Sequence, residues 1–334
     1  MKLIIQIPCY NERDNLSETL GDLPHEIPGI DCIETLIIDD GSTDGTAEFA
    51  RKLGVNHIVR FPRNRGLAKG FMAGIDACLR LGADVIVNTD ADNQYCGADI
   101  PKLVAPLVEG SADLVVGDRQ VEQVAHFSAT KKHLQKIGSW VVRLASGSEV
   151  PDAPSGFRAI GREAALRMFV VNDFTYTLET LIQAGNARLA IAAVPIRTNP
   201  KKRESRLFRN IPQYLQRSAG TIIRSYTMFR PLKAFLYLAS VLFFIGLILS
   251  LRFLYFHFTQ EQAGHVQSLV IAAVFLITAF VVLITGILAD LVGANRKLLE
   301  DLLTRLRRIE YGPSSPPPIP SETTSRPPQV ESTP

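Results

Sequence analysis

Short apolar runs alternate with amphipathic segments through the first two hundred residues of the chain. The runs are rich in β-branched residues and predict strands at Leu3–Ile7, Cys32–Ile38, His57–Phe61, Asp84–Thr89 and Asp113–Val116. Helical spacing between them predicts helices at Asn15–Leu20, from a cap at Asp44 to Leu53, at Leu67–Leu81 and at Ile100–Val108. Alternating strands and helices predict a parallel sheet covered by helices on both faces. Such sheets bind ligands at the carboxyl ends of their strands.

The last third of the chain has a different pattern. Phe235–Leu251 carries no charge and continues apolar to Phe256, and Leu269–Ala289 is a second such run. Each is long enough to cross a bilayer of about 30 Å, and a buried hairpin in a soluble protein is the alternative. The connector His257–Val266 lacks Lys and Arg, whereas both flanks contain them. The positive-inside rule therefore predicts a two-pass membrane protein with both termini in the cytosol, in the plasma or inner membrane of a prokaryote.

Basic residues gather just before the first apolar run. The net charge is only +3, yet the stretch from Arg197 to Lys233 contains ten Lys and Arg residues and the single acid Glu204. Apolar residues recur at helical spacing across Glu204–Arg230, which predicts amphipathic helices lying on anionic lipid or packed on the first domain. We expect this anionic partner to be a membrane and not a nucleic acid.

These patterns predict six regions. They are a catalytic or binding domain at 1–203, amphipathic helices at 204–231, spans at 232–256 and 266–290, a cytosolic helix at 291–311 and a tail at 312–334. The charged helix at 291–311 is a candidate for self-association into a homo-oligomer. The tail is rich in Pro, Ser and Thr, a composition typical of disorder.

Several common classes are disfavoured. The four cysteines have no C-x-x-C spacing, so we expect reduced thiols and no zinc site. The first strand is followed neither by G-x-G-x-x-G nor by a P-loop. No signal peptide is expected, because the apolar start is short and runs into Pro8.

The predicted strand at Asp84–Thr89 runs into two carboxylates, Asp90 and Asp92. Neighbouring side chains on an extended chain point opposite ways, so these two converge on one ion only if the backbone bends. Asn93 and Gln94 supply a turn and further oxygens. Oxygen ligands with positions left for water or phosphate favour Mg²⁺ or Mn²⁺, and a solvated turn that caps the next helix is the alternative.

Two other polar motifs, Pro8–Glu12 and Asp39–Thr46, also follow predicted strands. Asp39, Asp40 and Asp90 provide acceptors for ribose hydroxyls and base N–H groups, while a metal would neutralise phosphates. This combination predicts a site for a nucleotide diphosphate that bears a leaving group. For Asp44, the alternative to a role in ligand binding is a side-chain hydrogen bond that stabilises the turn.

The motifs, taken in order, resemble a known family. PCYNE at 8–12, DDGSTDGT at 39–46, RNRGLAKG at 63–70 and TDADNQY at 89–95 are similar to family 2 glycosyltransferases of GT-A fold. GDR at 117–119 and DAPSGFRA at 152–159 resemble the group containing dolichol-phosphate mannose synthase and bacterial polyprenyl-phosphate glycosyltransferases. Asn93 and Tyr95 depart from the mannose synthase pattern, in which Leu and His are usual, so the sugar stays open.

The resemblance implies an α/β fold with a Rossmann-like GT-A sheet and a set of site residues. Nucleotide-sugar contacts are assigned to Pro8, Tyr10, Asn11, Glu12, Asp39, Asp40, Lys69, Asp90 and Ala91. Metal ligands are assigned to Asp90, Asp92 and Gln94. The acceptor phosphate is assigned to Arg119, Ser155 and Arg158 by the resemblance, and to Arg203 because an anionic acceptor needs cations to approach the donor. Catalytic roles fall to Asp92, Arg119, Arg158 and Arg203, and an ordinary surface position is the alternative for each of these arginines.

The reaction implied is inverting transfer of a hexose from a UDP- or GDP-linked sugar to polyprenyl phosphate. A phosphate monoester is already anionic, so it needs cations to approach the donor and no general base. A lipid hydroxyl acceptor would need a base, for which Glu179 is the candidate to test. A non-catalytic subunit that binds nucleotide sugars is the other alternative.

Overall fold

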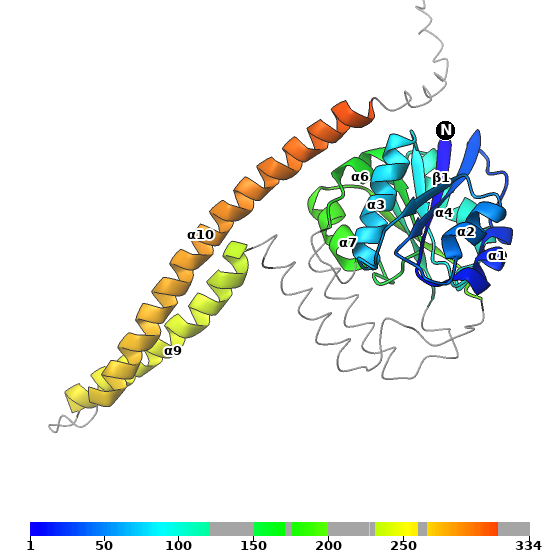
Figure 1. Ribbon diagram of the computed structural model, residues 1–334. Coiled ribbons are helices and arrows are strands. Elements are labelled where there is room, and N and C mark those ends of the chain that lie inside the picture. Colours follow the sequence, from blue (N-terminus) through cyan, green and yellow to red (C-terminus); the bar gives the residue numbers. More distant parts are fainter. Residues whose placement is uncertain (121–149, 171–175, 200–226, 228–230, 260–265, 313–334) are drawn as a thin grey trace, which may run out of the picture.

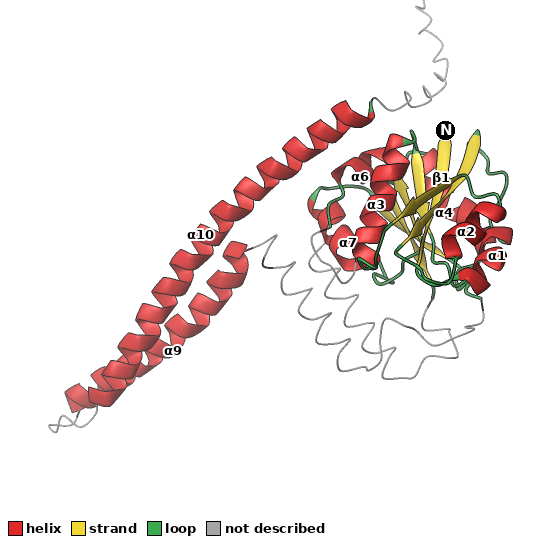
Figure 2. Cartoon of the chain, in the orientation of Figure 1, coloured by secondary structure: helices red, strands yellow, loops and turns green. Residues whose placement is uncertain are grey.

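The computed structural model describes residues 1–120, 150–170, 176–199, 227, 231–259 and 266–312. Figures 1 and 2 show a layered α/β domain followed by two long helices. The strands are β1 (Lys2–Cys9), β2 (Cys32–Asp39), β3 (His57–Arg60), β4 (Val85–Asn88), β5 (Leu114–Asp118), β6 (Arg158–Gly161) and β7 (Ile191–Pro195). The helices are α1 (Arg13–Gly21), α2 (Thr46–Lys52), α3 (Leu67–Arg80), η1 (Gly97–Asp99), α4 (Ile100–Val108), α6 (Arg162–Arg167), α7 (Thr177–Asn186), α9 (Pro231–Thr259) and α10 (Val266–Tyr311).

The strands form one mixed sheet in the order β3-β2-β1-β4-β6-β5-β7. β1 pairs in parallel with β2 and β4, and β5 pairs in parallel with β7. The prediction of a wholly parallel sheet is wrong for β6, which runs antiparallel to both β4 and β5. The reason is that β6 begins opposite the last residue of β4, with Arg158 paired to Asn88, so it has to run back across the sheet.

Apolar side chains cover both faces of the sheet, as predicted. One face packs against α3, α6 and α7 through residues that include Ile4, Ile38, Ile86, Val116, Phe71, Ile75, Leu166 and Leu181. The other face packs against α1 and α4 through residues that include Leu3, Ile5, Val85, Val87, Leu16, Leu103 and Val104. The central strands are buried on both sides, which explains their nearly continuous apolar sequences.

One buried polar side chain lies between the sheet and α3. Gln6 on β1 donates a hydrogen bond from Nε2 to Asn88 Oδ1 on β4 at 2.9 Å. Gly74 of α3 lies directly over it, and a Cβ added there would come within 2.3 Å of Gln6 Oε1 and 2.9 Å of Ile38 Cδ1. The helix can therefore approach the sheet this closely only with glycine at this position.

The two long helices, α9 and α10, pack against each other through small residues. Ala239 and Gly246 of α9, and Ala272, Ala279 and Gly286 of α10, are buried at intervals of seven residues. Large apolar side chains point outward along both helices, and both are long and apolar enough to cross a membrane. Close packing of small residues is typical of helix pairs in lipid.

Some predicted regions can be compared with these helices and others cannot. The predicted spans fall inside α9 and α10, and the helix predicted at 291–311 continues α10 without a break. The structure does not describe 200–226, 260–265 or 313–334, so the amphipathic helices (apart from a few residues), most of the connector and the tail lie outside the described residues.

A pair of glycine substitutions in α3 tests the close approach of this helix to the sheet. Gly74→Ala should lower the free energy of unfolding by about 1–3 kcal/mol, because the added methyl clashes with Gln6 and Ile38. Gly70→Ala in the same helix is the control. Its Cβ would meet only Ile38 Cγ2 at 3.8 Å, so the gain in helix propensity should stabilise the protein by up to about 1 kcal/mol. Thermal unfolding followed by circular dichroism in detergent measures both, and equal effects would contradict the packing described.

Candidate active site

The three polar motifs meet at one edge of the sheet. In Figure 1, β1 begins beside the label N and runs toward the opposite edge, and β2 and β4 run parallel to it. Cys9 at the end of β1 is paired with Asp39 at the end of β2, and Gln6 is paired with Asn88 at the end of β4. The segments after these strands therefore form a single rim, as the sequence predicted. Within it, Tyr10 is exposed and Pro8 is partly buried at the end of β1.

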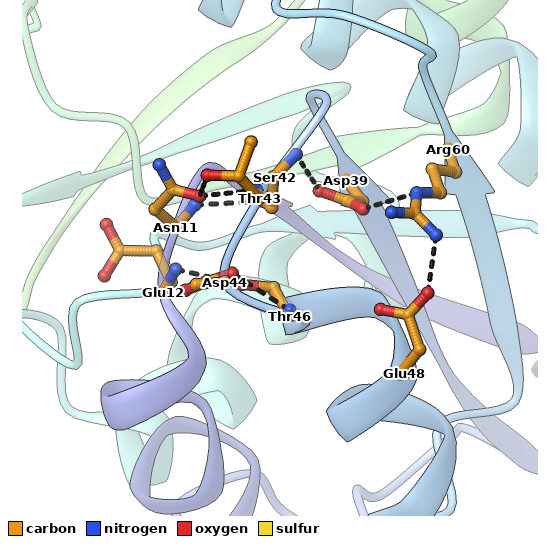
Figure 3. A network of polar contacts seen from close by, with 9 residues as sticks. All are labelled: Asn11, Glu12, Asp39, Ser42, Thr43, Asp44, Thr46, Glu48 and Arg60. Atoms are coloured by element: carbon orange, nitrogen blue, oxygen red, sulfur yellow. Dashed lines mark hydrogen bonds and ion pairs between the residues drawn. The ribbon is translucent and has the colours of Figure 1, made fainter.

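Hydrogen bonds join the first two loops of the rim (Figure 3). The main-chain N–H of Asn11 donates to Ser42 Oγ at 2.9 Å, and Thr43 N–H donates to Asn11 Oδ1 at 2.9 Å. The N–H of Glu12 donates to Thr46 Oγ1 at 3.1 Å. Asn11 has a positive φ of 54°, a conformation that asparagine tolerates better than most residues. Asn11 and Glu12, predicted as nucleotide contacts, thus also shape the rim itself.

The aspartates after β2 hold neighbouring loops. Asp39 accepts a hydrogen bond from Ser42 N–H on Oδ1 at 2.9 Å, and its Oδ2 lies 3.2 Å from Arg60 Nε (Figure 3). Asp40 accepts from Arg65 N–H at 2.6 Å and Gly66 N–H at 2.9 Å. Asp40 therefore anchors the loop that leads into α3.

Two further predictions concern the residues on either side of this loop. Lys69, assigned to the nucleotide sugar, is exposed in the first turn of α3. Helix α2 begins at Thr46 with Gly45 as its N-cap, so the prediction of Asp44 as the capping residue is wrong by one position. Asp44 instead accepts a hydrogen bond from Thr46 N–H at 3.0 Å, which is turn chemistry of the kind considered above.

The backbone bends between the acidic pair and the next helix, as the metal hypothesis required. Asn93 has a positive φ of 53°, and Gln94 N–H donates to Asp92 Oδ1 at 3.1 Å. The Ala91 carbonyl accepts from Thr19 Oγ1 of α1 at 3.0 Å, which fixes the middle of the turn. Asp92 and Gln94 are both partly buried.

Asp90 has a strongly shifted pKa. Its pKa is raised to about 7, first by burial and then by the negative charge of Asp92, while the positive charge of Arg119 opposes the rise. Two mutually repelling carboxylates that are each partly accessible suit a divalent cation with further oxygen ligands. In the ranges that the structure describes, no group of three or more His, Cys, Asp or Glu side chains is placed to hold a metal ion.

Arg119 is held next to this acidic pair by Asp152. Its Nε donates to Asp152 Oδ2 at 2.7 Å and its Nη2 donates to Oδ1 at 2.9 Å, a bidentate pair in which Asp152 is buried. Burial lowers the pKa of Arg119, but Tyr95, Asp152 and Asp90 together raise it by more, so its pKa is raised overall and it keeps its charge. The arrangement places a fixed cation at the rim, a geometry suited to an anion.

Arg158 faces the interior of the loop that carries Asp152. Its guanidinium is 1% exposed and donates to Ser155 O, Ala153 O and Thr180 Oγ1 at 2.8, 2.8 and 2.7 Å. Burial lowers its pKa to about 10. These contacts are those of a residue that shapes the loop, and its assignment to an acceptor phosphate stays a prediction. Ser155 is fully buried, and its hydroxyl has no hydrogen-bond partner within the described residues.

A buried network behind Asp90 was not predicted from the sequence. Asn88 Nδ2 donates to Gly156 O and to Tyr176 Oη, both at 2.9 Å, and Gly156 N–H donates to Tyr95 Oη at 3.1 Å. A Cβ on Gly156 would lie 3.4 Å from both carboxylate oxygens of Asp90. The available signal was Asn88 itself, a polar residue at the end of an otherwise apolar strand.

Of the two remaining candidates, one is buried in a helix and the other lies outside the described residues. Glu179, the base considered for a hydroxyl acceptor, is 2% exposed within α7. Arg203 lies outside the residues that the structure describes.

Known proteins share both the sequence pattern and the fold. The profile of the Glycosyl transferase family 2 matches residues 4–169. The polyprenol monophosphomannose synthase of Mycolicibacterium smegmatis is 29% identical over 206 residues, which cover 58% of this chain and 76% of that protein. The undecaprenyl-phosphate mannosyltransferase of Micrococcus luteus is 30% identical over 206 residues, which cover 59% of this chain and 83% of that protein.

A solved structure supports the same assignment at the level of the fold. Glucosyl-3-phosphoglycerate synthase from Mycobacterium tuberculosis, in complex with Mn²⁺, UDP-glucose and phosphoglyceric acid, superposes with a TM-score of 0.52 at 19% identity, covering 68% of this chain and 78% of that one. The predicted GT-A fold is thereby confirmed. From its motifs, its fold and these relatives, the chain belongs to glycosyl transferase family 2 and is a glycosyltransferase.

Proposed function

We propose that this glycosyltransferase moves a hexose from a nucleotide diphosphate sugar to a polyprenyl phosphate at a membrane surface. The observation that carries the proposal is the rim at which Asp90, Asp92 and Arg119 lie together, in a chain that also has two helices able to cross a membrane. The names of the relatives from Mycolicibacterium smegmatis and Micrococcus luteus, a polyprenol monophosphomannose synthase and an undecaprenyl-phosphate mannosyltransferase, support this acceptor.

The donor would bind along the loops after β1 and β2. Asn11 and Glu12 fix the first loop against Ser42 and Thr46, so both loops are preorganised for a ligand. Carboxylates at Asp39 and Asp40 supply acceptors for the hydroxyl and N–H groups of a nucleoside, whose base could be uracil or guanine. We keep Pro8, Tyr10, Lys69 and Ala91 as further donor contacts.

We assign the divalent cation, Mg²⁺ or Mn²⁺, to Asp90 and Asp92, with Gln94 as a further ligand. When bound, such an ion supplies positive charge to the leaving diphosphate. The protein offers only two carboxylates here, so the remaining ligands would be phosphate oxygens and water. The raised pKa of Asp90 fits this assignment, because the charge of Asp92 repels a second negative charge until a cation is present.

Arg119 would orient the acceptor phosphate. Asp152 holds its guanidinium through Nε and Nη2, which leaves Nη1 to donate toward an anion at the rim. A phosphate monoester attacks as an anion, so the protein has to hold charge in place and does not have to remove a proton. The burial of Glu179 accords with this scheme, in which no general base is needed and the anomeric centre is inverted.

The membrane assignment follows from α9 and α10. We place the spans at 232–256 and 266–290, the catalytic domain at 1–203 and both termini in the cytosol, since Lys and Arg flank the helices and are absent from the connector. The acceptor phosphate of a membrane lipid would then lie on the same side as the rim.

The reaction itself is tested by following labelled sugar into organic-extractable lipid. Membranes containing the protein are incubated with a panel of nucleotide sugars, with and without EDTA. We expect one donor to give a mild-acid-labile, EDTA-sensitive product, because a sugar phosphodiester of a polyprenol has an acid-labile anomeric bond. A product stable to mild acid would indicate a hydroxyl acceptor, and absence of product with every donor would contradict the proposed reaction.

Asp92→Asn tests the metal assignment. Removing one of two carboxylate ligands should weaken Mn²⁺ binding and reduce transfer by about 100-fold or more, with the melting temperature unchanged. The control is Asp84→Asn at the opposite end of β4, where the carboxylate only accepts a hydrogen bond from Lys2 N–H and asparagine can do the same. Full activity of the Asp92 variant, or equal losses in both, would refute the site.

Asp152→Asn tests whether Arg119 depends on its carboxylate partner. We expect kcat/KM to fall by about 10- to 100-fold, because an amide cannot hold the guanidinium in a bidentate ion pair. Arg119→Ala should cost at least as much, and the double variant should be no worse than Arg119→Ala alone. Additive losses in this cycle would show that Asp152 acts independently of Arg119. Asp113→Asn, which affects the far end of β5, is the control.

A further inference from the structure

The end of α10 returns to the catalytic domain. Arg307 is only 7% exposed, and its Nη1 donates to the carbonyls of Met168 at 2.6 Å and Leu166 at 3.3 Å. Its Nη2 lies 3.0 Å from Asp76 Oδ1 of α3. One arginine of the helix that follows the second span is therefore buried against two elements of the domain, α3 and the end of α6.

Further charged pairs surround Arg307. Arg308 pairs with Glu163 of α6 at 2.6 Å, and Glu310 pairs with Arg80 of α3 at 3.0 Å. The guanidinium of Arg80 also lies over the ring of Tyr311, at 5.8 Å from its centroid. These outer pairs are exposed and contribute little each, so the buried contacts of Arg307 dominate the interface.

Apolar packing holds this part of α10 only at its end. Leu299, Leu302, Leu306 and Ile309 are each more than half exposed, whereas Tyr311 packs against the core cluster that includes residues of α3 and α6. A helix end that docks mainly through one buried arginine and few apolar contacts depends strongly on that arginine, because its removal takes an ion-pair partner from Asp76 and a donor from two carbonyls.

The docking point lies at the edge of the sheet opposite the rim. Arg162, next to it, donates to Tyr311 O at 2.9 Å and to Ala83 O at 3.0 Å, and Ala83 lies two residues before the first residue of β4. Asp90 and Asp92 follow the other end of the same strand. Figure 1 accordingly shows α10 ending beside the edge at which β1 begins.

The length of α10 matches this geometry. We call residues 291–311 the α10 extension, the part of the helix beyond the proposed span. At 1.5 Å per residue it is about 30 Å long, comparable to the diameter of a small domain. The extension can therefore reach from the bilayer surface along the domain to its far edge.

From these contacts we propose that the α10 extension is a strut that holds the rim toward the bilayer, with Arg307 as the positioning residue that locks it to α3 and α6. This inference rests on the proposed lipid acceptor. The strut would leave the chemistry at Asp92 and Arg119 unchanged and would act only on the presentation of the rim to a lipid anchored in the membrane.

The test compares two acceptors with full-length protein. Arg307→Gln should reduce transfer to a long-chain polyprenyl phosphate in liposomes by about tenfold or more, since the undocked domain presents its rim in many orientations. Transfer to a short-chain, water-soluble prenyl phosphate in detergent should change less than about twofold. The control is Arg305→Gln on the same helix, because Arg305 is exposed and its one ion pair among the described residues is with Asp301 of that helix. It should leave both activities unchanged.

Docking is measured separately by crosslinking. Cysteines placed by Glu163→Cys and Arg308→Cys should be joined within one chain by a short bismaleimide, identified by mass spectrometry of the digest. Adding Arg307→Gln should reduce this crosslink severalfold, whereas adding Arg305→Gln should not. Unchanged crosslinking in Arg307→Gln, or equal loss of transfer with both acceptors, would overturn the strut. Absence of transfer by the unmodified protein to either acceptor would overturn the proposed function and the positioning role with it.

Discussion

The repulsion between Asp90 and Asp92 is the constraint on which the rest of the rim depends. A carboxylate at the end of a buried strand loses hydration, and a second carboxylate two residues later adds to its cost, which is why the pKa of Asp90 rises to about 7. The fold opposes this cost with Arg119, whose own position is secured by Asp152. One fixed arginine does not neutralise two acids. The pair therefore discourages a fully ionised state without a counterion, which is the physical basis for proposing that a cation binds here together with a phosphate-bearing ligand.

Holding the two acids in place requires polar groups inside the core. Asn88 bonds to Gln6, Gly156 and Tyr176, so the end of β4, the sheet interior and the loop after residue 152 form one buried network. Such a network tolerates little change, because the loss of one side chain leaves a buried polar group of another without its hydrogen-bond partner. The absence of a side chain at Gly156 lets the loop lie against Asp90. The geometry of the rim is thus set in part by buried residues behind Asp90.

The sequence predicted well the parts of this structure that depend on local pattern. The first five strands, the helices between them and the convergence of three motifs at one edge follow from apolar periodicity and from the topology of parallel sheets. The direction of β6 could not be obtained in this way, since it depends on where the chain re-enters the sheet after a long excursion. The burial of Arg158 could not be predicted from the sequence either. An arginine in a polar motif suggests a contact with a ligand, and only the structure shows that its guanidinium donates to Ser155, Ala153 and Thr180.

The sequence pattern also did not predict that α10 is one continuous helix. This continuity matters for how the rim is held. Composition changes from apolar to charged after Asp290, which predicted a separate cytosolic helix, but no proline interrupts the segment and the helix continues to Tyr311. It ends before Gly312, whose φ of 74° is typical of a helix terminus. A continuous rigid helix transmits orientation, whereas two helices joined by a hinge would not. Because its last turn is tied through Arg307 to the edge opposite Asp90 and Asp92, the apolar part of α10 is linked to the domain that carries the rim by a continuous helix and by buried contacts.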